Sequence, residues 1–137
     1  MASIEELKVY FGNDQFAVDQ GVEITGLGSE WATCTVALRK THFNALGYVQ
    51  GGLIFTLADF TFAVAANGRH MGTVTVNSTI NYLLPAAGSR LDAKAVMKSD
   101  GGKICVYEVE VTDENGAKVA FATVTGYVRR SRTKRKQ

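Results

Sequence analysis

The chain has 137 residues, of which 46% are apolar and 20% are charged, and its formal net charge is +2. These values are typical of one globular domain with a core, and they exclude a collagen-like, disulfide-rich or intrinsically disordered chain. Six basic residues fall within the last nine positions, so the body of the chain is mildly acidic. We therefore expect one domain over residues 1–130 and a basic, disordered tail over residues 131–137.

The beginning of the chain carries no visible export signal. It is acidic, with Glu5 and Glu6 where a signal peptide carries basic residues. No apolar run approaches the roughly 18 residues that a membrane span needs. We therefore expect a cytoplasmic protein without membrane association, and we expect Cys34 and Cys105 to be reduced core residues.

Most of the chain alternates between apolar and polar residues, which predicts strands. Residues 4–11 predict a short helix that stops at Gly12, and residues 21–25 predict a strand followed by a turn at 26–29. The further predicted strands are 32–38, 74–84, 91–98, 105–112 and 119–128. In the segment 74–84, the predicted inward face consists of Val74, Val76, Ile80, Tyr82 and Leu84.

One long segment interrupts these strands. Residues 52–67 are rich in Ala and Leu, are apolar almost all round, and end in Asn67-Gly68, a good C-terminal cap. A helix that is apolar on nearly every face must be buried. The simplest packing is an α+β domain, in which an antiparallel sheet of about five to six strands wraps around one central helix.

Asp59 is the only charged residue between Lys40 and Arg69, and it lies in the middle of this helix. An unpaired charge is costly to bury, and no basic residue stands three or four positions away to neutralise it. Asp59 therefore either pairs with a distant basic residue, meets water at a helix edge, or is a carboxylate held in a cleft for reaction.

Gly51 and Gly52 stand where the buried helix begins. The first N–H groups of a helix have no partner within it and carry the positive end of its dipole. Two glycines let another oxygen approach this backbone closely. Such a site could hold a carbonyl oxygen that gains negative charge during a reaction.

Residues 42–59, HFNALGYVQGGLIFTLAD, resemble the N-x-x-G-x-x-[HQ]-G-G-x-x-x-x-L-x-D signature of hotdog-fold thioesterases. They are most similar to the phenylacetic-acid-pathway type, a branch that also contains animal acyl-CoA thioesterases. Residues 77–85 resemble the third strand of that family, so the resemblance spans about residues 16–128. It implies a hotdog fold and an enzyme that hydrolyses acyl-CoA to a free acid and coenzyme A.

The resemblance also implies roles for individual residues. Asp59 would be the general base or the nucleophile, while Asn44 and the Gly51 N–H would hold the thioester carbonyl. Members of the family work as homodimers or homotetramers, with Asp59 of one chain facing Asn44 and Gly51 of another. We expect no cofactor, because coenzyme A is part of the substrate and the product. The residues expected to bind substrate are Gln50, Gly52, His42, Thr56 and Asn77.

The sequence leaves alternatives open. Gln50 replaces a His of many relatives, and a glutamine can donate a hydrogen bond but cannot shuttle a proton. His42 also resembles the His of hotdog hydroxyacyl dehydratases, but these need a carboxylate near Thr56, where this chain has none. A non-catalytic acyl-CoA-binding protein could dispense with Asp59, so Asp59 favours the enzyme. A carrier-protein thioester is a further possible substrate, and the acyl group cannot be read from the sequence.

Two other features are expected to have no role in the chemistry. His70 has no second ligand at suitable spacing, so we expect no metal. The tail has no aromatic residues between its basic ones, so we expect no nucleic-acid partner. The basic tail would serve as a solubilising end, or Arg129 and Arg130 would contact the phosphates of coenzyme A.

Overall fold

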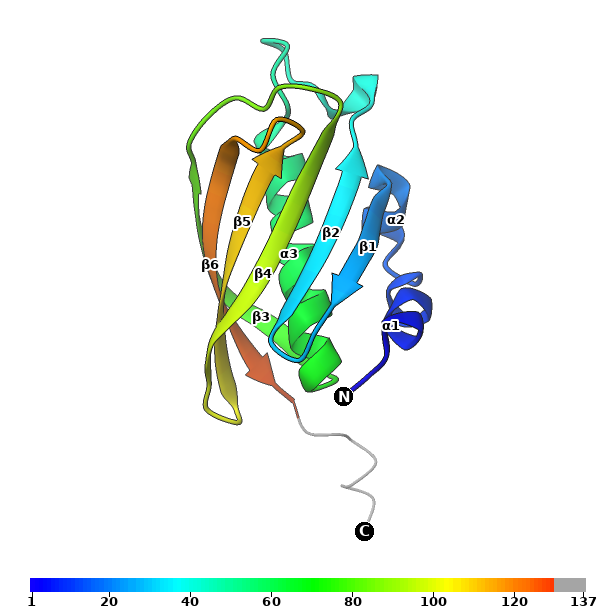
Figure 1. Cartoon of the computed structure of the whole chain (residues 1–137), viewed down its shortest axis with the longest axis vertical. Coiled ribbons are helices and arrows are strands. Elements are labelled where there is room, and N and C mark those ends of the chain that lie inside the picture. The colour runs from blue at the N-terminus through cyan, green and yellow to red at the C-terminus, as the bar shows by residue number, and fades with distance from the viewer. Residues whose placement is uncertain (130–137) are drawn as a thin grey trace.

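The computed structural model describes residues 1–129, and the predicted tail at 131–137 lies outside the described residues. Six antiparallel strands form one sheet in the order β1-β2-β4-β5-β6-β3, which curls around the helix α3 (Figure 1). The elements are α1 (Ile4–Phe11), α2 (Gln15–Gln20), β1 (Val22–Leu27), β2 (Trp31–Ala37), a short 3-10 turn (Lys40–His42), α3 (Gly51–Arg69), β3 (Thr73–Tyr82), β4 (Arg90–Asp100), β5 (Ile104–Asp113) and β6 (Lys118–Val128). The α+β prediction of a sheet wrapped around a central helix is confirmed.

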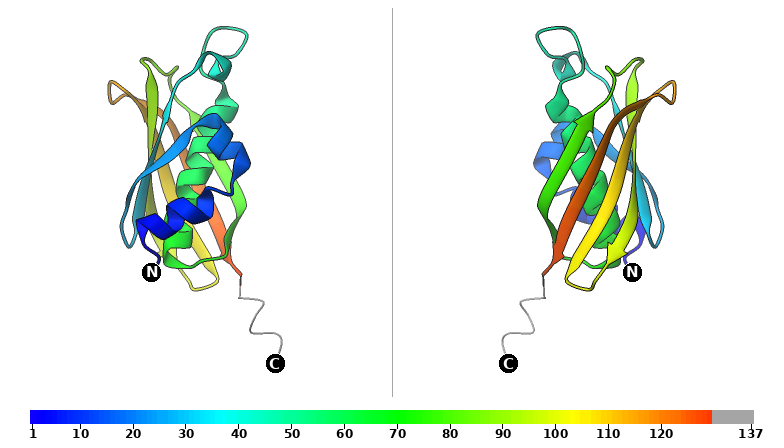
Figure 2. Two further views of the ribbon diagram at one scale, coloured as in Figure 1. Left: turned by 90° about the vertical axis from the view of Figure 1, so that its right-hand side faces the viewer. Right: turned by 90° about the vertical axis from the view of Figure 1, so that its left-hand side faces the viewer.

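α3 forms the core together with the inward faces of the strands. It lies against the concave face of the sheet (Figure 2). The buried stretches of β5 and β6 alternate with period two, as half-buried strands require. Phe62 of α3 and Tyr107 of β5 are both fully buried and meet edge to face, with ring centroids 5.5 Å apart.

α3 begins one residue earlier and ends two residues later than predicted. The helix is long and apolar enough to cross a membrane, although the sequence predicted no such segment. In the fold, however, 67% of this stretch is buried. Burial against a sheet explains the apolar composition without a bilayer.

The predicted cap at Asn67-Gly68 is wrong, because α3 continues through both residues to Arg69. Gly68 is buried, and a side chain there would press on Leu27 and Leu7. The Asn67 side chain is buried as well, and its Oδ1 accepts hydrogen bonds from the Gly72 and Thr73 N–H groups at 2.8 and 3.0 Å. Asn67 therefore fixes the turn from α3 into β3 instead of ending the helix.

Two helices, where the sequence predicted one, precede the sheet. α1 starts with a capping box formed by Ser3 and Glu6. α2 is capped by Asp14, whose side chain accepts from the Ala17 N–H at 3.1 Å, and it ends at Gly21 in the left-handed conformation. With six residues and one buried side chain, α2 is too short to show helical periodicity in the sequence.

β3 is an edge strand with a bulge. It pairs with β6 on one side, and no described strand pairs with its other side. The register shifts between Thr75 and Asn77, so that Val76 has no partner on β6. Before the bulge, Thr75 lies opposite the buried Gly126, and after the bulge Ile80 lies opposite the buried Ala122. The predicted inward face is therefore correct at Ile80 and Tyr82, which lie opposite buried residues of β6, and wrong before the bulge, where Val74 is exposed. Leu84, also predicted to face inward, is exposed and lies beyond the end of β3.

Candidate active site

Asp59 lies on the one stripe of α3 that the described chain leaves uncovered. This stripe consists of Gly52, Phe55, Thr56, Asp59 and Ala63, at spacings of three and four residues. Asp59 is half-buried there, and its Oδ1 accepts a hydrogen bond from the Thr75 hydroxyl at 2.9 Å. Within residues 1–129 it forms no ion pair, so pairing with a distant base, one of the alternatives from the sequence, is not observed.

Burial raises the pKa of Asp59 above its ordinary value. The hydrogen bond from Thr75 opposes this rise, and the negative charge of Asp14 adds to it. Asp14 belongs to the loop between α1 and α2, so the N-terminal helices bring a second carboxylate near the first. A carboxylate with a raised pKa is a stronger proton acceptor once it is ionised, as a general base requires.

The N-terminus of α3 presents one free N–H group. Gln50 caps the helix, since its side-chain Oε1 accepts from the Gly52 N–H at 3.1 Å. The Gln50 carbonyl accepts from the N–H groups of Leu53 and Ile54. Among the first four N–H groups of α3, only that of Gly51 has no partner within residues 1–129. It lies at the positive end of the helix dipole and can receive an oxygen.

Asn44 stands in the loop that leads into α3. Its Oδ1 accepts from the N–H groups of Leu46 and Tyr48 at 2.9 and 3.1 Å. These bonds fix the turn, which also contains Gly47 with a φ of 85°. The carbonyl half of the Asn44 amide is therefore occupied, and the NH₂ half is left to donate to another molecule.

A cavity of about 310 Å³ adjoins this end of the helix. It is lined by Gly51 and Ile54 of α3, by Tyr48 and by the segment 82–86. The Tyr82 hydroxyl donates to the Gly51 carbonyl at 3.1 Å and so ties the end of β3 to the first turn of α3. A group held at the Gly51 N–H has access to this cavity.

The other residues predicted to bind substrate have different environments. Gln50 is exposed and acts as the helix cap, and its cap bond occupies the Gly52 N–H. The Thr56 hydroxyl donates to the Gly52 carbonyl at 2.7 Å. Asn77 follows the bulge and lies opposite Thr125, so it belongs to the outer face of the sheet. The β3 residue that contacts Asp59 is Thr75, before the bulge.

His42 is 2% exposed, and its carbonyl accepts from the N–H of Gln50, the residue before Gly51, at 2.8 Å. Its Nδ1 accepts from the Arg39 N–H at 3.0 Å, so the proton of the neutral ring resides on Nε2. Burial lowers the pKa of His42, which keeps the ring neutral. His42 thus supports the turn before the loop, and within the described chain no contact links it to the groups around Asp59.

His70 lies at the opposite end of α3 and contacts Asp100, which Arg69 also binds at 2.6 Å. The Arg69 guanidinium holds the pKa of Asp100 well below its usual range. Within residues 1–129, no group of three or more His, Cys, Asp or Glu side chains could hold a metal ion. The two cysteines are free and buried.

The proposed groups are too far apart to act together within one copy of the chain. Asp59 is eight residues beyond Gly51, about 12 Å along the helix at 1.5 Å per residue. Groups that act on one carbonyl must each lie about 3 Å from the reacting atoms. One copy therefore presents two half-sites, one at the start of α3 and one at its middle.

Two residues that act on Asp59 were not predicted from the sequence: Thr75 donates a hydrogen bond to it, and the charge of Asp14 raises its pKa. Thr75 is positioned by the bulge, which an alternating pattern does not reveal. Asp14 reads in the sequence as part of a helix stop, and its proximity to Asp59 depends on how α1 and α2 fold back over α3.

Comparison with known proteins gives consistent results. Residues 46–120 match a family described as "Thioesterase superfamily". The chain is 31% identical to "Acyl-coenzyme A thioesterase PaaI" of Escherichia coli over 81% of this chain and 80% of that one. It is 29% identical to mouse "Acyl-coenzyme A thioesterase 13" over 84% and 85% of the two chains.

Solved structures agree with these matches. The structure of the E. coli PaaI protein superposes with a TM-score of 0.85 and 26% identity over 90% of each chain. A hypothetical thioesterase from Streptococcus pneumoniae, solved with coenzyme A, gives a TM-score of 0.81 and 27% identity over 89% of this chain and 98% of that one.

Proposed function

This chain belongs to the thioesterase superfamily, whose members hydrolyse thioesters, and we propose that it hydrolyses acyl-coenzyme A with Asp59 as its general base. The observation that carries the proposal is the half-buried Asp59 carboxylate on the open stripe of α3, hydrogen-bonded to Thr75 and without an ion-pair partner in residues 1–129. A structural role would not require an unneutralised charge at this position.

The proposed reaction uses groups that the structure leaves free. The thioester carbonyl oxygen accepts hydrogen bonds from the Gly51 N–H and the Asn44 amide NH₂. Asp59 takes a proton from a water molecule as the water oxygen bonds to the carbonyl carbon, and the two donors stabilise the resulting oxyanion. The carbon–sulfur bond then breaks, and Asp59 returns the proton to the departing thiolate. The products are a carboxylic acid and coenzyme A.

We propose that each complete site forms between two copies of the chain. In a two-fold pair whose axis is perpendicular to α3, the two α3 helices run antiparallel, so Gly51 of each copy can approach Asp59 of the other. Phe55 is four residues from both Gly51 and Asp59, so it falls at the two-fold axis. Phe55 is 36% exposed on α3, and Val76 is 57% exposed on the edge strand β3. An unpaired edge strand and an exposed aromatic side chain suit a contact between copies.

Light scattering is expected to give a dimer or a tetramer of the 14.8 kDa chain. Phe55→Glu should give monomers, because it places two like charges against each other at the axis, and activity should fall with the loss of the dimer. Val9→Glu is the matched control: Val9 is 77% exposed on α1, and its replacement should change neither mass nor rate. A wild-type chain that is monomeric and fully active at micromolar concentration would contradict the shared site.

The proposal does not require a cofactor, because coenzyme A enters as part of the substrate. We also propose that the protein is cytoplasmic. Thiols stay reduced there, which agrees with the free and buried Cys34 and Cys105. Burial raises the pKa of Cys34 to about 12, which makes this thiol an unsuitable nucleophile. The dehydratase alternative lacks support, since His42 is buried and Thr56 bonds to its own helix.

The direct test is a panel of aryl-, short-chain and long-chain acyl-CoAs assayed for released thiol with a thiol-reactive dye. We expect turnover of at least one class, with release of one thiol for each thioester. Acyl groups on a carrier protein, assayed in parallel, separate coenzyme A from carrier-protein substrates. Tight binding of acyl-CoA without thiol release would instead identify a non-catalytic binding protein.

A further inference from the structure

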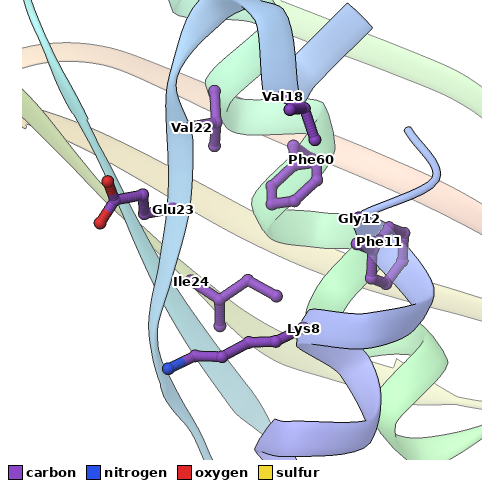
Figure 3. A pocket seen from close by; sticks show the side chains of 8 residues that line it. All are labelled: Lys8, Phe11, Gly12, Val18, Val22, Glu23, Ile24 and Phe60. Atoms are coloured by element: carbon purple, nitrogen blue, oxygen red, sulfur yellow. The ribbon is translucent and has the colours of Figure 1, made fainter. Parts of the chain in front are cut away.

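A second cavity, of about 270 Å³, lies between the N-terminal helices and the edge strand β1 (Figure 3). Of its eight lining residues five are apolar, while the Lys8 side chain runs along its edge and the Glu23 carboxylate points away from the apolar side chains (Figure 3). The apolar side chains that line it are Phe11, Val18, Val22, Ile24 and Phe60. The cavity opens to solvent, since Lys8, Gly12, Val18 and Glu23 are exposed. A hydrocarbon chain bound against its apolar side chains would remove apolar surface from water, which favours binding.

This cavity adjoins the half-site at the middle of α3. Phe60, which forms its inner wall, directly follows Asp59 in the chain. Gly12, which also lines it, is two residues from Asp14, whose charge acts on Asp59. Phe11 meets Phe60 edge to face, with ring centroids 5.3 Å apart. Asp59 itself does not line the cavity, but its neighbour in the chain, Phe60, does so on the side of α3 that meets Phe11 of α1.

The two cavities differ in the hydrogen bonds they offer. The one at the start of α3 is bordered by the irregular segment Leu83–Ala86, and within residues 1–129 the Leu83 and Leu84 carbonyls accept no hydrogen bond. Free carbonyls suit the amide groups of a pantetheine arm. The second cavity is lined mainly by the apolar side chains of α1, α2, α3 and the inner face of β1, with Lys8 and Glu23 as its polar residues. It suits a chain that needs no hydrogen-bond partner.

We propose that this second cavity binds the hydrocarbon end of the acyl group, so that the protein prefers alkyl acyl-CoAs of medium chain length to acetyl-CoA. The inference rests on the proposed function, because it requires the thioester carbon to lie at Asp59. The acyl chain then extends into the second cavity of the copy that supplies Asp59. The coenzyme A arm extends into the cavity at the start of α3 of the copy that supplies Gly51. Each methylene that enters should raise kcat/KM about fourfold, until the cavity is full.

Val18→Trp tests this assignment. Val18 lines the cavity and is 50% exposed, so a larger side chain should fill the cavity without disturbing the core. We expect kcat/KM for decanoyl-CoA to fall at least tenfold, while kcat/KM for acetyl-CoA stays within twofold of wild type. Val9→Trp, the same change at a solvent-facing position of α1, should alter neither value. If Val18→Trp does not fold, Val18→Phe repeats the test with a smaller ring.

An unchanged ratio of decanoyl-CoA to acetyl-CoA turnover in a folded Val18→Trp would overturn the inference. A loss of long-chain preference in Ala86→Trp instead would assign the acyl chain to the other cavity. Calorimetry with the non-hydrolysable decyl-CoA and ethyl-CoA thioethers separates this result from a failure of the proposed function. If wild type hydrolyses nothing but Val18→Trp still weakens decyl-CoA binding selectively, the cavity assignment stands and the catalytic proposal falls.

Discussion

Replacing Asp59 with asparagine is expected to lower kcat by about 10²–10⁴-fold while the fold stays intact. Asparagine has nearly the same shape, and its oxygen can still accept the hydrogen bond from Thr75. It cannot take a proton from water, so the proposed base is lost and little else changes. Thiol release from the best acyl-CoA substrate, measured together with the melting temperature on the same preparation, checks the result.

The same variant should be more stable than wild type at neutral pH. Because the pKa of Asp59 is raised in the folded protein, folding favours the protonated carboxyl. The stability that Asp59 contributes is therefore fully present below its unfolded pKa of about 3.9 and is lost as the pH rises through the higher folded value. The gain in melting temperature from Asp59→Asn should be largest at pH 7 and vanish in acid. A variant that melts lower and turns over normally would end the catalytic assignment.

The raised pKa of Asp59 should also appear in the rate. Activity requires the ionised carboxylate, so the acid limb of kcat/KM should lie above the pH expected of an ordinary aspartate. Thr75→Val, which removes the hydrogen bond that lowers this pKa, should move the limb to still higher pH. A limb that stays in place in Thr75→Val would show that Thr75 does not act through Asp59.

Replacing Asn44 with aspartate should lower kcat by at least about 10²-fold. The new carboxylate can still accept from the Leu46 and Tyr48 N–H groups, so the turn before α3 keeps its bonds. It loses the NH₂ donor and places a negative charge where the oxyanion forms. Kinetics on acyl-CoA, with KM and kcat separated, should show the loss mainly in kcat.

Asn44→Ala separates the two halves of the amide. It removes the donor and also the two turn bonds, so it should lower both the rate and the melting temperature. Asn44→Asp should lower the rate with little change in melting temperature. If Asn44→Asp retained wild-type kcat, Asn44 would be a turn residue alone.

A mixture of the two inactive variants tests the shared site. In a dimer of one Asp59→Asn chain and one Asn44→Asp chain, one site carries both changes and the other carries neither. If subunits exchange at random in an equal mixture, about a quarter of all sites should be intact. No recovery of activity after verified exchange would place both residues in the same chain's site.

The sequence predicted the architecture well because alternation and the apolar helix are strong signals. β2, β4, β5 and β6 have bounds close to those expected, and the family matches confirm the resemblance carried by residues 42–59. α2 was missed because it buries one side chain, Ala17, and its cap Asp14 looks like a turn residue. The end of α3 was misplaced because Asn67 and Gly68 follow the rule for caps. Inside the helix, Gly68 packs against Leu7 and Leu27, and Asn67 bonds to the turn into β3.

The candidate site was predicted in part. Asp59 stood out as a lone charge in an apolar helix, and its half-buried position on α3 agrees with that reading. Its neighbours could not be predicted, because Thr75 reaches it through a change of strand phase and Asp14 through the packing of two short helices. The distance of about 12 Å between Gly51 and Asp59 follows from helix geometry once the helix is predicted.

The bulge at Val76 has a consequence for how this chain can vary in length. Strand ends and loops usually tolerate an inserted or deleted residue, since only local connections change. Here the loss of Val76 would remove the bulge and leave Thr75 opposite Gly126, on the face where it contacts Asp59, because Val76 is the residue without a partner on β6. In a chain of unchanged length, pairing Val76 into the ladder would instead turn the first part of β3 over, with Thr75 outward and Val74 inward. This point of β3 should therefore tolerate the deletion of one residue better than a substitution that straightens the bulge.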